Sequence, residues 1–377
     1  MNAGLVVVKV GTRSLTIDDG NLDLEKMKSL VDQVAEATRK GYRIILVTSG
    51  AIASGIAELG VKANPNDIVF KQACAAAGQS ILMAHYREFF KRHGLRVAQV
   101  LLTEQDLSNR ISYLHTCNVL DRLLQLGVVP IINENDVTSV NEIIPVMKGY
   151  RVNFSDNDIL SVLIANATEA DLVVILSTVE GLYTKHPEKP GARLIPVVEK
   201  ITPELKEAAE GKGRLGRGGM KTKLEAAEIS MRSGIPLVIA NSRRSNVLLD
   251  ILDDKPVGTY FRPGEKGLPG IKRWIAYGAG AKGQIYVNEG AKKAIMKGAS
   301  LLAVGIEKVS GQFQVGDVVS LIDPDGREFA RGIVNYSSEE VNLIKGMNTA
   351  QIRKALGYIR QKEIIIRKRT HLMKEEE

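Results

Sequence analysis

Short aliphatic and β-branched runs recur through the first 261 residues and alternate with amphipathic stretches. Six of these runs predict buried strands: Leu5–Val10, Arg43–Thr48, Arg96–Leu102, Val128–Asn133, Leu172–Leu176 and Pro236–Ala240. Helical spacing of hydrophobic positions predicts helices over Leu24–Arg39 and Met220–Ser233, which stop at Gly41 and Gly234. Strands that alternate with helices indicate βαβ units. We therefore expect an α/β fold with a mostly parallel sheet sandwiched by helices.

The pattern changes after this part of the chain. Residues 262–271 are rich in Gly and Pro and predict a linker. Beyond it, short strands with one or two short helices are expected, the strands at Trp274–Tyr277, Gln284–Val287, Val318–Ile322, Ala330–Asn335 and Glu363–Arg367. The turn Pro324-Asp325-Gly326 predicts a hairpin. We expect one domain at 1–261, a linker at 262–271 and a small, mostly β domain at 272–377.

Composition excludes several classes of protein. The 377 residues are 44% hydrophobic and 25% charged, which is typical of a globular chain with a sizeable core. No apolar run reaches the roughly 18–20 residues of a membrane span, and the start of the chain lacks the basic segment of a signal peptide. Two cysteines and five scattered histidines predict neither a disulfide scaffold nor a metal site. We expect a cytoplasmic protein.

The net charge of +8 is concentrated towards the end of the chain. From Arg273 onwards the chain carries 17 Lys and Arg against 12 Asp and Glu. Such an excess favours an anionic partner, either ligand phosphates or a nucleic acid, although solubility alone explains it equally well.

In a parallel sheet, ligands bind at the carboxyl ends of the strands, so the functional residues are expected there. The first strand contains Lys9 and is followed by Gly11, Thr12, Arg13 and Ser14. A lysine within an apolar strand is costly unless it is paired or binds an anion. Small residues after it let backbone N–H groups approach a phosphate. The alternative is a lysine at a sheet edge or strand end that reaches water.

Three further turns follow the same logic. Ser49, Gly50 and Ala51 lie where the second strand enters a helix, and could bind an anion or simply cap that helix. Residues 133–136 (NEND) follow a buried strand and suit an ammonium group or a polar turn. Ser155 and Asp158 fit a helix-capping box, which would by itself explain Asp158.

A glycine-rich loop precedes the helix at Met220. Its residues 216–223 (GRGGMKTK) offer backbone amides and two lysines to phosphates, unless the loop is simply solvated. Two segments that fit GxGxxG, 211–216 and 278–283, do not lie between a strand and a helix and are rejected as dinucleotide sites. No Walker A motif is present. Lys9, Lys223 and several amide-rich turns at one sheet edge indicate phosphoryl transfer to a small polar molecule.

These motifs, in this order, resemble the amino acid kinase family over the whole chain. They are VVKVGT (7–12), VTSGAIASG (47–55), INEND (132–136), SDND (155–158), EGLYT (180–184) and GGMKTK (218–223). The part from about Lys272 resembles a PUA domain. The combination is most similar to members that use ATP to phosphorylate the γ-carboxylate of L-glutamate to L-glutamyl 5-phosphate, the first step of proline biosynthesis.

The resemblance implies a role for each matching residue. Lys9 and Lys223 neutralise the transferring phosphoryl group, and Asp158 orients both lysines. Ser49, Asp136 and Asn157 bind glutamate, with Asp136 at the α-ammonium. The residues implied in ATP binding are Lys9, Gly11, Gly50, Ala51, Ser177, Thr178, Arg217, Gly218, Gly219, Met220, Lys221, Thr222 and Lys223. ATP and Mg²⁺ are the expected cofactors.

The chain departs from the family pattern at five positions. Ser177-Thr178 replaces a usual Thr-Asp, His186 a usual Asp, Arg217 a usual Thr, and Ser155 a usual Gly. All but Ser155 concern the nucleotide side, so the expectation for the amino acid substrate is the firmer one.

Several alternatives and partners stay open. The chain could act chiefly as an RNA-binding protein through the PUA-like domain, but its few aromatic residues offer little stacking surface. A kinase with another carboxylate acceptor is a second alternative. The resemblance further implies feedback inhibition by proline, a homo-oligomer and a reductase that acts next in the pathway.

Overall fold

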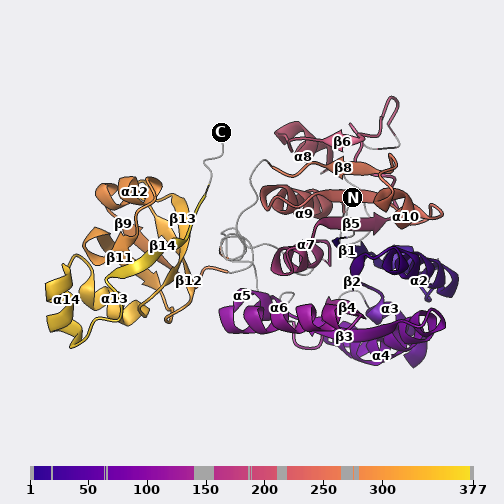
Figure 1. Cartoon of the computed structure of the whole chain (residues 1–377), viewed down its shortest axis with the longest axis horizontal. Coiled ribbons are helices and arrows are strands. Elements are labelled where there is room, and N and C mark those ends of the chain that lie inside the picture. The colour runs from indigo at the N-terminus through magenta and orange to yellow at the C-terminus, as the bar shows by residue number, and fades with distance from the viewer. Residues whose placement is uncertain are drawn as a thin grey trace. The chain divides into compact units, whose positions relative to one another are not determined.

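The computed structural model describes residues 4–17, 20–62, 64, 67–139, 157–185, 187, 189–209, 219–264, 275 and 280–373. Internal contacts divide the chain into two compact units (Figure 1). The first comprises residues 1–106 and 115–268, and the second comprises residues 107–114 and 269–377. The grouping of the short segment 107–114 with the second unit was not predicted from the sequence. Most of the predicted linker lies outside the described residues, as does the predicted strand Trp274–Tyr277 apart from Ile275.

The first unit contains an eight-stranded sheet within its described residues, in the order β3-β4-β2-β1-β5-β7-β8-β6 (Figure 1). Its strands are β1 (Leu5–Val10), β2 (Arg43–Val47), β3 (Arg96–Leu102), β4 (Val128–Glu134), β5 (Leu172–Ser177), β6 (Val197–Val198), β7 (Leu237–Asn241) and β8 (Thr259–Phe261). Its helices are α1 (Thr12–Leu15), α2 (Leu24–Arg39), α3 (Ala51–Leu59), α4 (Ile68–Arg92), α5 (Glu104–Ser108), α6 (Arg110–Gln125), α7 (Asn157–Ala167), α8 (Pro203–Ala209), α9 (Met220–Arg232) and α10 (Val247–Leu252).

The predicted fold class is confirmed. Neighbouring strands of the sheet pair in parallel, apart from β7 and β8, which are antiparallel. All six predicted strands are present, with ends shifted by at most one residue. The short strands β6 and β8 were not predicted, since two or three residues are too few to show a period.

Each face of the sheet carries its own helices, with α2 and α10 on one side and α7 and α9 on the other (Figure 1). Alternate residues of β1 point to opposite faces. Val6, Val8 and Val10 pack in the core with residues of α2 and α10. Lys9 therefore points towards the opposite face, which α7 and α9 cover.

Helices α3 and α4 pack with their backbones in close contact. A Cβ atom on Gly55 would lie 1.7 Å from the carbonyl oxygen of Cys74, and one on Gly78 would lie 1.9 Å from that of Ala51. Glycine is the only residue that fits at both positions without a shift of one helix. The contact fixes the start of α3, which follows β2 at the carboxyl edge of the sheet.

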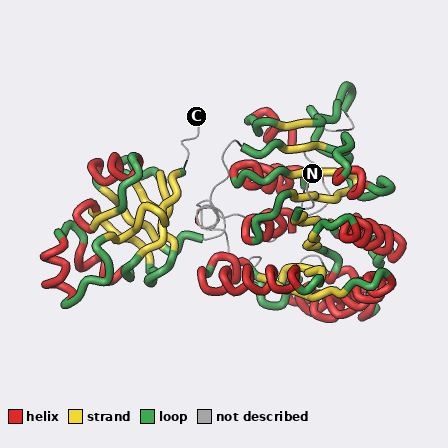
Figure 2. The backbone as a smooth tube through the Cα atoms, in the orientation of Figure 1, coloured by secondary structure: helices red, strands yellow, loops and turns green. Residues whose placement is uncertain are grey.

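The second unit consists mainly of strands, with short helices at its periphery (Figure 2). Its sheet has the order β10-β14-β13-β12-β9-β11. The strands are β9 (Gly283–Val287), β10 (Leu301–Leu302), β11 (Ile306–Gly311), β12 (Val318–Ile322), β13 (Glu328–Val334) and β14 (Glu363–Leu372). The helices are α12 (Glu289–Met296), the 3₁₀ turn η2 (Ala303–Gly305), α13 (Ser338–Ile344) and α14 (Thr349–Leu356).

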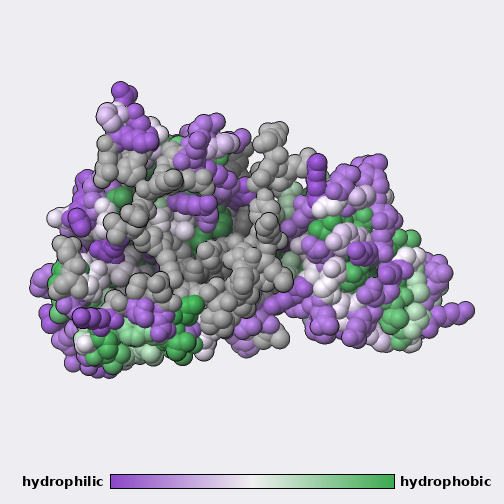
Figure 3. Space-filling view, turned by 180° about the vertical axis from the view of Figure 1, so that it is seen from behind, coloured by the Kyte–Doolittle hydropathy of each residue, from purple (hydrophilic) through white to green (hydrophobic). Residues whose placement is uncertain are grey.

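The predicted hairpin joins β12 to β13, and Gly326 in its turn has φ +82°. The described residues 280–373 hold three short α-helices, more than the one or two expected, because helices of eight residues or fewer give a weak periodic signal. On the face seen in Figure 3, hydrophilic side chains of this unit lie between smaller hydrophobic areas. Within the described residues, no helix combines the length and the apolar character that crossing a membrane requires.

Candidate active site

A cavity of about 560 Å³ lies at the carboxyl ends of β1, β2, β4 and β5. The cavity thus lies at the edge of the sheet where the functional residues were predicted from the sequence. Twelve of the predicted site residues line it: Lys9, Gly11, Ser49, Gly50, Ala51, Asp136, Asn157, Ser177, Thr178, Gly219, Met220 and Lys223.

The remaining predicted residues lie elsewhere. Asp158 is fully buried beneath the cavity wall. Lys221 and Thr222 are described but do not line the cavity, and Lys221 is exposed at the start of α9. Arg217 and Gly218 lie outside the described residues, as do Ser155 and His186.

Two buried lysines share one buried carboxylate at the centre of the cavity. Lys9 Nζ lies 2.6 Å from Asp158 Oδ1, and Lys223 Nζ lies 2.8 Å from Asp158 Oδ2. The side chains of both lysines are 7% exposed, and that of Asp158 is 0% exposed. Lys9 therefore has the partner that a lysine in an apolar strand requires, and it does not lie at a sheet edge.

The electrostatics of this group fix its charge. Burial of Asp158 opposes ionisation, but the positive charges of Lys9 and Lys223 outweigh it and hold the pKa of Asp158 below its ordinary value. The three side chains together carry one net positive charge in a region of low dielectric constant. Such a group suits an anion that gains charge during a reaction.

A chain of amide side chains organises the part of the cavity next to β4. Asn157 Nδ2 donates to the carbonyl oxygen of Thr48 at 2.8 Å, to Ser49 Oγ at 2.9 Å and to Asn133 Oδ1 at 3.1 Å. Asn133 Nδ2 in turn donates to Gln79 Oε1 at 2.9 Å. The sequence predicted Ser49 and Asn157 but neither Gln79 nor the role of Asn133, because α4 and β4 meet only in the folded chain.

Two acceptors in this part of the cavity are suited to a cationic group. Asn157 Oδ1 is buried and accepts no hydrogen bond from the described residues. Burial raises the pKa of Asp136 to about 6. A carboxylate desolvated in this way gains strongly from a positive partner.

The turn from β2 into α3 is shaped by a glycine. Gly50 adopts φ +108°, which strains any other residue, and it occupies the N-cap position of α3. The alternative prediction of Ser49 as a plain helix cap is therefore wrong. Ser49 Oγ instead accepts from Asn157.

The order of the strands separates the cavity into two ends. From β4 through β2 and β1 to β5, the strands lie side by side, so their following residues lie in the same order. The end beside β4 and β2 carries Asp136, Asn157 and Ser49, and we call it the acceptor end after the substrate contacts that the sequence predicts for these residues. The end beside β5 and α9 carries Ser177, Thr178 and Gly219, and we call it the nucleotide end after the predicted ATP contacts. The lysines and Asp158 lie between the two.

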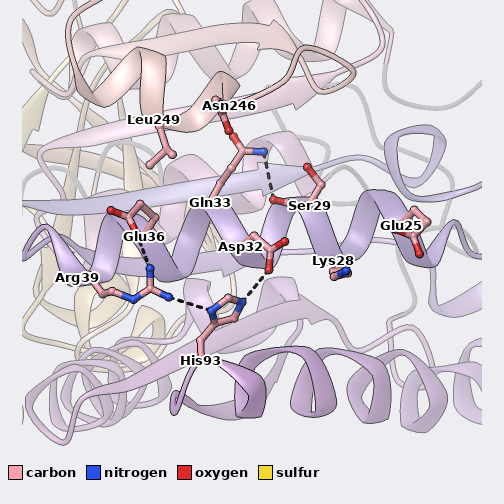
Figure 4. Close-up of a pocket in the computed structure, with 10 residues that line it drawn as sticks. All are labelled: Glu25, Lys28, Ser29, Asp32, Gln33, Glu36, Arg39, His93, Asn246 and Leu249. Atoms are coloured by element: carbon pink, nitrogen blue, oxygen red, sulfur yellow. Dashed lines mark hydrogen bonds and ion pairs between the residues drawn. The ribbon is translucent and has the colours of Figure 1, made fainter.

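A second cavity, of about 410 Å³, lies along α2 and is not a candidate for the same chemistry (Figure 4). His93 lies between two residues of α2, with Nε2 2.7 Å from Asp32 Oδ1 and Nδ1 3.0 Å from Arg39 Nη2. Arg39 also pairs with Glu36. These polar side chains thus pair with one another on the surface of α2.

Comparison with known proteins identifies the family. Residues 4–241 match the amino acid kinase family, and residues 283–356 match the PUA domain. This chain belongs to the amino acid kinase family. The glutamate 5-kinase of Thermoanaerobacter pseudethanolicus is 45% identical to it over 365 residues, which are 96% of each chain. That of Caldanaerobacter subterraneus is 46% identical over the same share of each chain.

A solved structure gives a looser likeness. The UMP kinase of Bacillus anthracis superposes with a TM-score of 0.45 and 15% identity, covering 68% of this chain and 95% of that one.

The alternative of a chain that acts mainly by binding RNA is not favoured. The relatives named glutamate 5-kinase match both the kinase part and the PUA part. In the second unit, Phe313, Phe329 and Tyr336 are buried, and the exposed Tyr358 donates to Glu340 and lies beneath Arg360. The described aromatic rings therefore offer little surface for stacking bases.

Proposed function

We propose that this protein is a glutamate 5-kinase, which transfers the γ-phosphoryl group of ATP to the γ-carboxylate of L-glutamate. The observation that carries the proposal is the buried Lys9–Asp158–Lys223 group between the acceptor end and the nucleotide end of one cavity. The product is L-glutamyl 5-phosphate, the first intermediate of proline biosynthesis.

The chemistry requires positioning and positive charge rather than a general base. The γ-carboxylate of glutamate, with a reference pKa of about 4.3, is ionised at neutral pH and is itself the nucleophile. One of its oxygens forms a bond to the γ-phosphorus while the bond from that phosphorus to the β,γ-bridging oxygen breaks, so the electron pair leaves with ADP. Lys9 and Lys223 offset the negative charge of the transferring group, and Asp158 holds both ammonium groups in place.

Each end of the cavity supplies the remaining contacts. Asp136 and Asn157 Oδ1 accept the α-ammonium of glutamate, and Ser49 contributes its hydroxyl. Gly11 stands beside Lys9, since a Cβ atom there would lie 3.5 Å from Lys9 Nζ, and its position leaves the backbone open to phosphate. The other ATP contacts come from the nucleotide end and from the start of α9.

Mg²⁺ enters this site with the nucleotide. Across the described residues, no three His, Cys, Asp or Glu side chains converge to hold a metal ion. Asp158, the carboxylate between the two ends of the cavity, already pairs with two lysines. Mg²⁺ commonly binds through substrate phosphates and water with few protein ligands, and it supplies charge neutralisation there.

Further properties are proposed from the similarity to glutamate 5-kinases. Proline inhibits the enzyme by competing for the acceptor end, and the chain forms a homo-oligomer in the cytoplasm. The acyl phosphate is labile, so a reductase consumes it next. Glutamate kinetics that millimolar proline leaves unchanged would remove the first of these proposals.

Trapping of the acyl phosphate tests the reaction directly. With Mg-ATP, L-glutamate and hydroxylamine, we expect ADP release and glutamate-dependent hydroxamate. Lys9→Met removes one charge at the transferring group and should lower kcat by about 10²–10³-fold. Lys40→Met is the matched control, because Lys40 pairs with Asp253 on the surface, and it should leave the rate unchanged. Hydroxamate formation with aspartate or acetylglutamate but not with glutamate would change the acceptor and keep the reaction.

A further inference from the structure

We propose that Lys71 binds the α-carboxylate of the amino acid substrate and so selects which γ-carboxylic acids enter the site. The inference rests on the proposed function. L-Glutamate carries a second carboxylate beside its ammonium group, and the three residues predicted to bind glutamate offer a hydroxyl, an amide and a carboxylate. None of these is a cation, so the second carboxylate needs another partner.

Lys71 lies at the acceptor end of the cavity. It lines the cavity together with its neighbour Gln72, near the start of α4. Gln72 Nε2 donates to the carbonyl oxygen of Ser139 at 3.2 Å, and Ser139 Oγ donates to Glu134 Oε1 at 2.6 Å. These two bonds tie the start of α4 to the end of β4, and Asp136 follows β4 directly. The fold thus brings Lys71 and Asp136 to one end of the cavity.

The distribution of charge along the cavity assigns the role to this lysine. Among the described residues that line the cavity, four are cations, and each has a separate place. Lys9 and Lys223 share Asp158 at the centre. Arg13 lies in α1, directly after β1. Of these four described cations, Lys71 lies at the acceptor end, where its half-buried side chain can reach a bound carboxylate.

The arrangement matches an α-amino acid group. The substrate presents an ammonium and a carboxylate on one carbon, and Asp136 with Lys71 presents the complementary pair. A γ-carboxylic acid that lacks the α-carboxylate cannot form an ion pair with the ammonium of Lys71. We therefore expect the site to discriminate against L-isoglutamine, in which a neutral amide replaces only the α-carboxylate.

The experiment compares L-glutamate with L-isoglutamine on the wild type and on Lys71→Met. Calorimetric titration gives the two dissociation constants, and ADP release gives kcat/KM for each acceptor. Lys71→Met should raise the dissociation constant for L-glutamate about tenfold to a hundredfold, the range for a hydrogen bond to a charged group. The dissociation constant for L-isoglutamine should change by about twofold at most. The preference for glutamate should therefore collapse. Lys71→Arg should restore part of it.

Lys91→Met is the matched control, since Lys91 is exposed in the last turn of the same helix. It should leave the preference intact. Equal losses for both acceptors in Lys71→Met would show a structural role and overturn the inference, as would a wild type that binds both equally well. A wild type that binds glutamate through Lys71 but forms no hydroxamate would overturn the proposed function alone.

Discussion

Among the described residues of the first unit, three charged side chains are buried. Lys9, Lys223 and Asp158 are nearly inaccessible to water, and the two lysines hold the pKa of Asp158 below its ordinary value. Asp136, half-buried at the acceptor end, holds a carboxylate for which burial is unfavourable. Burial of these charges disfavours folding but allows the site to bind charged ligands. Substitution of these residues should therefore change both the free energy of unfolding and ligand binding.

Asp158→Asn should destabilise the protein and reduce its activity. The substitution leaves two buried lysines without their common anion, and loss of one partner of a buried ion pair costs about 3–5 kcal/mol. Urea unfolding followed by circular dichroism measures the free energy of unfolding. Because folding lowers the pKa of Asp158, its contribution is present above about pH 4, the unfolded value, and is lost as the pH falls through the folded pKa.

The control for this substitution is Asp253→Asn. Asp253 pairs with Lys40 on the surface, where both side chains are about 40% exposed. An exposed pair contributes about 1 kcal/mol or less. If both substitutions lowered the free energy of unfolding equally, burial of the Lys9–Asp158–Lys223 group would add nothing to its contribution to stability.

Asp136 should make glutamate binding depend on pH. With its pKa at about 6, Asp136 is ionised at pH 7 and increasingly neutral below pH 6. A neutral carboxyl group cannot pair with the α-ammonium, so the dissociation constant for L-glutamate should rise between pH 7 and pH 5. Calorimetric titration across this range measures it.

Asp136→Asn tests whether Asp136 itself causes this pH dependence, because the charged residues Glu134 and Lys71 line the same end of the cavity. The variant should bind glutamate more weakly at pH 7 and show a flat dependence between pH 5 and pH 7. The same slope in the variant as in the wild type would assign the titration to another group.

At the scale of elements, the site is built from the ends of adjacent strands. The register of β1 with β2 and β5 sets Lys9 opposite Val47 and Ile175, so the turns after these strands converge. Helices α7 and α9 bring Asp158 and Lys223 to the same point from one face. The close contact of α3 with α4 brings the turn at Gly50 and the side chain of Lys71 to the cavity.

Gly78→Ala should disturb the acceptor end although it lies outside the cavity. The added Cβ atom would meet the carbonyl oxygen of Ala51 at 1.9 Å and the nitrogen of Gly55 at 2.2 Å, so α3 must move. Overpacking of this kind costs about 1–3 kcal/mol, more than the roughly 1 kcal/mol that alanine gains in a helix. We expect lower stability and a higher KM for glutamate.

Gly290→Ala is the matched control, because this helical glycine has no atom closer than 3.4 Å to an added Cβ. It should be neutral or slightly stabilising. A stabilising effect of Gly78→Ala would contradict the close backbone contact.

At the scale of the whole molecule, the chain forms two units, each with its own hydrophobic core. The first contains the proposed kinase site, and the second matches the PUA domain. The basic character of the second unit is partly neutralised within it, since Arg360 pairs with Glu340, Arg331 with Glu328 and Lys292 with Asp323.

Binding of the full chain to single-stranded RNA should accordingly be weak and dependent on salt. With a net charge of +8 and few accessible rings, we expect the non-specific range of about 10⁻⁴–10⁻⁶ M, with a steep loss between about 50 and 200 mM salt. Fluorescence anisotropy with a labelled RNA oligomer measures this. Nanomolar affinity that resists salt would revive a nucleic acid function for the second unit.

Six of the eight described strands of the first unit, the fold class and half of the residues that line the cavity could be predicted from the amino-acid sequence. This was possible because aliphatic runs report burial, and because the carboxyl ends of parallel strands meet at one edge whatever the details of packing. The sequence also predicted that Lys9 needs a partner, since an unpaired charge in an apolar strand is costly.

Tertiary structure alone decided which partners meet. That Asp158 joins Lys9 to Lys223, that Gln79 holds Asn133, and that Lys71 lies with Asp136 all follow from contacts between elements far apart in the chain. A periodic pattern records only which side of an element is buried, not which element covers it. The same limit explains why segment 107–114 gave no sign of its place with the second unit.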